Sequence, residues 1–168
     1  EAKRDITIAT NLMETRLICG DPQLRLTMLA KTGPDKIWAA ADFYQGKIDE
    51  QLARHHKHDD TEYNLEPNVK EAPGGLRDIQ LANWTAKRHF NVHRRSQLVQ
   101  KGFLSEEEYL TLRRDEEFLW RVRYGLHLIA GRPEERLLFD YQRKLATMLG
   151  YSDSEGTVSY THLRAHET

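Results

Sequence analysis

The chain has 168 residues, enough for one domain with a core of its own. Its 25 Lys and Arg residues are balanced by 26 Asp and Glu residues, which argues against a nucleic-acid partner because no basic surplus is available for a polyanion. The single cysteine excludes an intramolecular disulfide, as is typical of the cytoplasm. No apolar run approaches the roughly 20 residues that span a bilayer, and no signal peptide opens the chain. We therefore expect a cytoplasmic protein with no membrane partner.

The first twenty residues differ in pattern from the rest. Asp5 is suited to cap a short helix. Residues 13–19 then alternate in a way that permits a strand, in which Cys19 would be buried. The sequence begins at Glu1 without an initiator Met and runs directly into a structured pattern, so we interpret residue 1 as an arbitrary cut within a longer protein. Residues 1–20 would then be the end of a domain whose other strands are missing.

After residue 20 the pattern becomes helical. Asp21 and Pro22 give a cap followed by proline at the first helical position, and Gly33 closes this helix. A second helix is predicted from Pro34, with an apolar stripe of Ile37, Ala41, Tyr44, Ile48 and Leu52. Four more helices are expected, over residues 76–90, 96–101, 105–130 and 133–149. The sequence thus predicts a mainly α fold, a helical bundle that follows a strand remnant.

Residues 59–75 show no periodicity, and their Pro and Gly residues exclude a regular element. A loop of this length inside a compact domain is often functional. The run His55–His56–Lys57–His58–Asp59–Asp60 precedes it. Although His58–Asp59 resembles the metal-binding dipeptide of HD hydrolases, no second set of ligands accompanies it, so we interpret the run as a solvated helix end.

The residues of this loop carry a specific resemblance. Residues 63–80, which read YNLEPNVKEAPGGLRDIQ, closely resemble the signature loop of the PII-protein uridylyltransferase/uridylyl-removing enzymes. Residues 9–20, 118–123 and 131–142 also resemble that family, so the likeness runs in order over residues 1–156. Ala72 departs from the pattern, since the family often has glycine there. Residues 157–168 do not continue it and are interpreted as a non-native tail.

The resemblance implies a nucleotidyltransferase that uses Mg²⁺ to move UMP from UTP to a tyrosine of the PII signal protein. It also implies a downstream HD domain that removes the UMP, and ACT domains that respond to glutamine. In that family the nucleotidyltransferase (α+β) domain would end at residues 1–20, and residues 21–156 would form a helical substrate-binding and linker region. Two metal-binding carboxylates would precede residue 1, so we expect the isolated chain to be inactive. The alternative is a helical protein-interaction module without chemistry.

The resemblance also points to candidate site residues. Glu14 aligns with the third metal-binding carboxylate of the family; alternatively it is a salt-bridged surface residue beside Arg16. The nucleotide would be bound by the loop and the helix start after it, through Lys70, Gly74, Gly75, Arg77 and Asp78. Paired glycines allow close backbone approach, a helix N-terminus attracts anions, and Lys and Arg suit phosphate. The alternative is a rigid loop that braces a domain interface, with Arg77 paired to Asp78 or Glu66.

Overall fold

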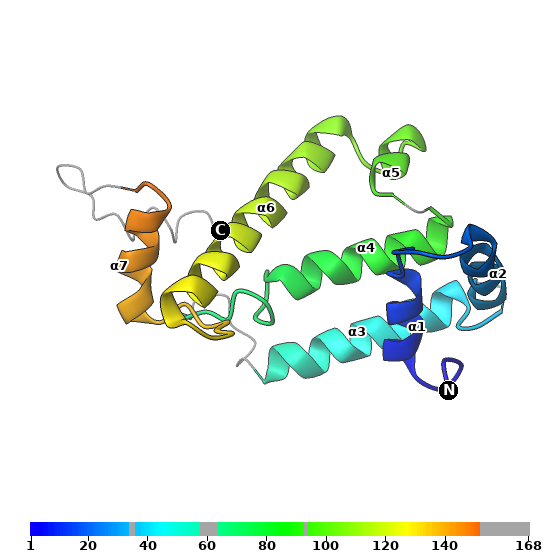
Figure 1. Ribbon diagram of the computed structural model, residues 1–168, viewed down its shortest axis with the longest axis horizontal. Helices are drawn as coiled ribbons and strands as arrows, with labels where there is room; N and C mark the ends of the chain where they lie inside the picture. The colour runs from blue at the N-terminus through cyan, green and yellow to red at the C-terminus, as the bar shows by residue number, and fades with distance from the viewer. Residues whose placement is uncertain (34–35, 58–63, 93, 152–168) are drawn as a thin grey trace. The chain divides into compact units, whose positions relative to one another are not determined.

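The computed structural model describes residues 1–33, 36–57, 64–92 and 94–151. Within these ranges the chain is mainly helical, as predicted (Figure 1). The helices are α1 (Ile6–Met13), α2 (Pro22–Thr32), α3 (Ala40–His56), α4 (Leu76–Phe90), α5 (Ser96–Gln100), α6 (Glu106–Ala130) and α7 (Phe139–Met148). Extended pairing in the described ranges is limited to one antiparallel bridge between Asn68 and Arg136. The His58–Asp59 pair and the tail 157–168 lie outside the described residues.

The chain divides into two compact units. The first combines residues 1–52 with 80–105, and the second combines residues 53–79 with those from 106 onward. The long helices α3 and α4 therefore contribute residues to both units. No helix in the part of the chain that the structure describes is both long and apolar enough to cross a membrane. The boundaries predicted at residues 20 and 156 stay predictions.

The start of the first unit follows its local signals. The Asp5 carboxylate accepts hydrogen bonds from the backbone N–H groups of Thr7, at 2.7 Å, and Ile8, at 3.3 Å, and so caps α1 as predicted. Residues 15–18 have no regular structure, and Cys19 is exposed rather than buried. A strand needs a neighbour to pair its backbone groups, and no such neighbour occurs here in the described ranges. The strand remnant therefore stays a prediction.

The prediction for α3 is wrong in its start and in most of its apolar stripe: Ile37 is buried as predicted, but Ala41, Tyr44 and Leu52 are exposed. Residues 36–39 form turns, and α3 begins at Ala40, because Trp38 has a φ of 48° that no helix continues through. The fully buried side chains of α3 are those of Phe43 and Lys47. Tyr44, which was predicted to lie in the apolar stripe, is 54% exposed.

The first unit's core explains this change of face. Phe43 is completely buried and belongs to a cluster with Ala9 and Ile37. The buried guanidinium of Arg88 lies 5.4 Å from the centre of the Phe43 ring and donates hydrogen bonds of 2.6 and 3.0 Å to the Trp38 carbonyl oxygen. Phe43 thus faces a buried cation whose hydrogen bonds are satisfied by backbone, an arrangement that no apolar periodicity predicts.

In the second unit α6 packs on α7. Val122 and Leu126 of α6 and Leu145 of α7 are buried in one cluster. Gly125 makes the close approach possible, since a Cβ there would overlap the Leu145 side chain. The last helix begins at Phe139 and not at Pro133 as predicted, because the residues between them pair with the loop before α4.

Candidate functional site

The signature loop has a backbone that two glycines make possible. Gly74 has a φ of 77°, a conformation that side chains with a Cβ rarely adopt. Gly75 has no room for a Cβ, which would lie 2.9 Å from the Ala72 carbonyl oxygen and 3.0 Å from that of Lys70. Ala72, where the family often has glycine, is buried at 7% exposure. The paired glycines are therefore required by the turn itself, before any ligand is considered.

The turn occupies the backbone donors at the start of α4. The N–H groups of Gly75, Leu76 and Arg77 donate to the carbonyl oxygens of Ala72, Val69 and Lys70 at 2.9, 3.1 and 2.8 Å. An anion at this helix start would need those donors, and here the loop itself accepts their hydrogen bonds. In this conformation a phosphate would have to be bound by the side chains of Lys70 and Arg77.

Asp78 lies in the first turn of α4 and accepts hydrogen bonds from three directions. The Gly74 N–H donates to one carboxylate oxygen at 2.9 Å, and the Arg54 guanidinium donates to the other. The His55 ring nitrogen Nε2 lies 2.9 Å from Asp78 Oδ2. The His55 side chain is only 19% exposed, so the prediction of a solvated helix end is wrong for this residue. The end of α3 is tied to the start of α4 through one carboxylate.

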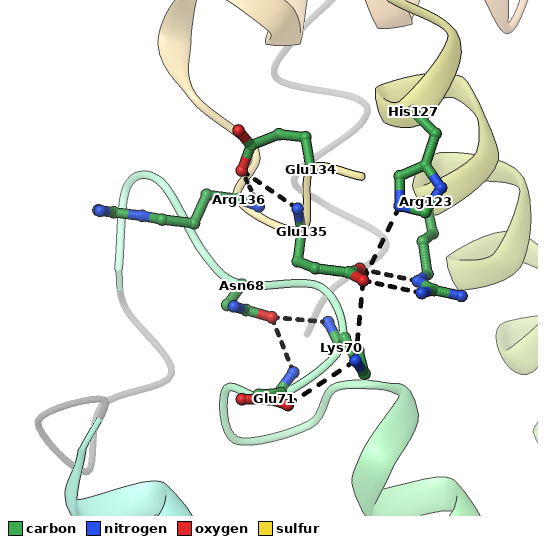
Figure 2. Close-up of polar contacts among 8 residues, drawn as sticks. All are labelled: Asn68, Lys70, Glu71, Arg123, His127, Glu134, Glu135 and Arg136. Carbon is green, nitrogen blue, oxygen red and sulfur yellow. Dashed lines mark hydrogen bonds and ion pairs between the residues drawn. The ribbon is translucent and has the colours of Figure 1, made fainter. Parts of the chain in front are cut away.

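A second polar cluster ties the loop to α6 (Figure 2). The Arg123 guanidinium donates two hydrogen bonds of 2.7 Å to the Glu135 carboxylate. The Lys70 ammonium lies 3.8 Å from the same carboxylate and 3.9 Å from that of Glu71. The His127 ring also lies 3.8 Å from Glu135 (Figure 2). Lys70, a predicted nucleotide ligand, thus stands beside a carboxylate that Arg123 already holds.

The backbone supports the same connection. The Val69 N–H donates to the Glu135 carbonyl oxygen at 2.9 Å, and the Leu137 N–H donates to the Pro67 carbonyl oxygen at 2.9 Å. The Glu66 carboxylate accepts a hydrogen bond of 2.9 Å from the Phe139 N–H at the start of α7. These contacts fix the first half of the loop on the segment between α6 and α7.

Glu135 gives the second unit a pH dependence. The hydrogen bonds from Arg123 hold the pKa of Glu135 below its usual value, and Coulombic attraction to Arg123, Lys70 and His127 acts in the same direction against desolvation. A carboxyl whose folded-state pKa is depressed contributes stability above its unfolded pKa of about 4.3, and that contribution is lost as the pH falls through the folded pKa.

We predict that Glu135→Gln lowers the free energy of unfolding at pH 7 by about 1–2 kcal/mol, because it removes a charged acceptor from Arg123. The difference between variant and unchanged chain should shrink as the pH falls below about 4.3, the unfolded pKa of a Glu side chain, toward the lowered folded pKa of Glu135. Urea denaturation followed by circular dichroism from pH 3 to 7 measures both effects. A difference that is constant over this range would contradict the role of the Glu135 charge.

The contacts of Glu14 favour the salt-bridged alternative. Its carboxylate lies 2.8 Å from the Lys87 ammonium and accepts a hydrogen bond of 3.1 Å from the Trp84 indole, while its side chain stays 47% exposed. The ion-pair partner is Lys87, 73 residues further along the chain. Over the described ranges, no group of three or more His, Cys, Asp or Glu side chains could hold a metal ion.

The structure brings some of the predicted residues together within the second unit. Gly74, Gly75 and Asp78 form one tight turn with Lys70 beside it. Glu14 belongs to the other compact unit. Arg54 and Glu135 were not predicted as partners of the loop, since each is an ordinary charged residue without a local motif around it.

Comparison with known proteins agrees with the resemblance. A model of the GlnD PII-uridylyltransferase family matches residues 42–167. Two relatives are described as bifunctional uridylyltransferase/uridylyl-removing enzymes. The one from Ectopseudomonas mendocina is 52% identical over 96% of this chain, and the one from Stutzerimonas stutzeri is 52% identical over 95% of it. One from Pseudomonas aeruginosa is 53% identical over 92%.

The chain spans only 17–18% of the length of these relatives. No solved structure matches it. Since the family model covers most of the chain and the likeness to these relatives extends along nearly all of it, the chain belongs to the GlnD PII-uridylyltransferase family.

Proposed function

We propose that this chain is the helical region of an enzyme that transfers UMP from UTP to a tyrosine of the PII protein, and that the same enzyme removes the UMP with another domain. The observation that carries the proposal is the 52% identity over 96% of the chain to a bifunctional uridylyltransferase/uridylyl-removing enzyme. The reaction takes place in the cytoplasm, and glutamine acts through domains outside this chain.

In this proposal the signature loop contacts the UTP phosphates through Lys70 and Arg77. The Lys70 side chain is 30% exposed and lies at 3.8–3.9 Å from two carboxylates, distances that leave it able to turn toward a stronger anion. Arg77 adds a planar guanidinium suited to two phosphate oxygens. Mg²⁺ would be held by carboxylates outside this chain, with Glu14 joining them only if it leaves Lys87.

We predict that the 168-residue chain alone does not transfer UMP. The family resemblance implies that two of the metal-binding carboxylates lie outside this chain, so the electrostatic stabilisation that phosphoryl transfer needs would be missing. The chain and the full-length enzyme that contains it are incubated separately with UTP, Mg²⁺ and PII, and the intact mass of PII is measured. The full-length enzyme should add one UMP to PII and the chain none; addition by the chain would refute the prediction.

The second candidate is a helical module that docks PII without chemistry. The first unit offers such a module two large exposed apolar side chains, Ile18 and Leu24, which are 84% and 73% exposed. Calorimetric titration of PII into the chain tests it. Heat of binding at either of two temperatures would support docking of PII by this chain, and no heat at both would refute it, since apolar contacts have little heat at one temperature only.

A further inference from the structure

Asp78 has a different role from the other residues of the signature loop. Among the predicted nucleotide ligands it is the only anion, and a carboxylate facing the triphosphate would repel it. Its partners include the Arg54 guanidinium, the His55 imidazole and the Gly74 N–H, all groups of the chain itself. The contacts of Arg54, His55 and Gly74 with Asp78, which we call the Asp78 cluster, therefore need an explanation other than nucleotide contact.

The Asp78 cluster connects three consecutive pieces of the second unit. Arg54 and His55 belong to the last turn of α3, Gly74 to the turn, and Asp78 to the first turn of α4. The Arg54 side-chain Nε also donates to the Glu71 carbonyl oxygen at 3.2 Å, so one guanidinium reaches both the loop and Asp78. The side chains of Arg54 and Asp78 are 14% and 17% exposed, which weakens competition from water.

The contact with Gly74 matters most for the backbone of the loop. Gly74 has the left-handed φ of 77°, which defines the direction of the turn, and its N–H is held by Asp78 Oδ2 at 2.9 Å. The two residues after it direct their N–H groups at the carbonyl oxygens of Ala72 and Val69. Of the N–H groups of Gly74, Gly75 and Leu76, that of Gly74 alone is bound by Asp78, while the other two donate to loop carbonyl oxygens.

We propose that Asp78 is a positioning residue, which fixes the Gly74–Gly75 turn on the end of α3 and thereby sets where Lys70 and Arg77 meet the nucleotide. The connection is short. The Arg77 N–H donates to the Lys70 carbonyl oxygen at 2.8 Å, so the backbones of the two cationic residues are joined across the turn that Asp78 holds. This inference rests on the proposed function, since it assigns Asp78 an effect on nucleotide contact.

The experiment is Asp78→Asn in the full-length enzyme that contains this chain, with steady-state kinetics in UTP. A positioning role predicts that kcat/KM for UTP falls by about 10- to 100-fold, the scale on which displaced binding groups act. A carboxylate facing the phosphates predicts the opposite sign, a lower KM for UTP once the negative charge is gone. Asp42→Asn is the matched control, because Asp42 also lies in the first turn of a helix but is exposed. It should change neither constant.

Two further measurements separate positioning from a general loss of structure. Uridylyl removal by the same variant should stay within about twofold of the unchanged enzyme, because that activity is proposed for another domain. Arg54→Met should lower kcat/KM for UTP in the same way, and combining it with Asp78→Asn should add little, since both changes break one interaction. A parallel loss of transfer and removal, or full additivity, would overturn the positioning role.

Hydrogen exchange of the peptide that contains residues 68–78, measured without UTP, tests the geometry independently of activity. Asp78→Asn should speed exchange at the Gly74 amide, because an amide oxygen accepts more weakly than a carboxylate, and Asp78→Ala, which leaves no acceptor, should speed it further. Unchanged exchange would overturn the inference. Faster exchange without a change in kcat/KM for UTP would also overturn the inference, but it would leave the proposed function intact. The proposed function itself would be refuted if the enzyme without any substitution did not transfer UMP.

Discussion

Replacing Arg77 with alanine in the full-length enzyme is expected to cost about 2–4 kcal/mol of transition-state stabilisation, which corresponds to a fall of roughly 30- to 1,000-fold in kcat/KM for uridylyl transfer. The backbone donors at the start of α4 already bind the loop, so a phosphate at this site depends on side chains. Loss of the Arg77 guanidinium would remove the forked donor from the site. Arg77→Lys keeps the charge but loses the fork, so it should show an intermediate defect.

The structural alternative for Arg77 predicts another pattern. If the residue only braces the loop, Arg77→Ala would lower the melting temperature and weaken transfer and removal together. The decisive experiment therefore measures uridylyl transfer, uridylyl removal and thermal unfolding on the same protein preparation. Loss of transfer with the other two intact supports a nucleotide contact. Equal loss of all three would refute it and assign the loop a bracing role.

Truncating Phe43 is expected to have the largest effect on stability. Phe43→Ala should lower the free energy of unfolding by about 3–5 kcal/mol, because the side chain is completely buried and its removal leaves a cavity. Arg88 and Lys47, both 3% exposed, lie 5.4 and 5.7 Å from its ring centre and would lose their aromatic neighbour. Urea denaturation of the variant and the unchanged chain measures the difference.

Two control variants make the Phe43 result specific. Tyr44→Ala changes the adjacent residue, which is 54% exposed, and should cost less than about 1 kcal/mol. Phe43→Leu keeps most of the apolar volume but loses the aromatic face, so a cost of about 1–2 kcal/mol would measure the contribution of the two cations. If Tyr44→Ala lowered the free energy of unfolding as much as Phe43→Ala, Phe43 would not be the side chain that α3 buries.

Local signals in the sequence determined much of the helical structure. The caps at Asp5 and Asp21 act over two or three residues, and both carboxylates accept the backbone N–H groups that such caps bind. The paired glycines before α4 indicated an irregular turn, and Gly74 has the left-handed conformation that only glycine adopts easily. The family resemblance of the loop could also be recognised in the sequence, since it depends on residue identity and order alone.

The tertiary structure decided the features that depend on distant residues. Helix α3 begins late because Trp38 turns its carbonyl oxygen to Arg88, 50 residues further along the chain. Helix α7 begins late because residues 135–137 bind the loop backbone some 70 residues earlier. Asp78 likewise finds Arg54 across 24 residues. Periodicity and capping describe neighbours within a few residues, so they carry no information about hydrogen bonds and ion pairs that form only when separate segments pack together.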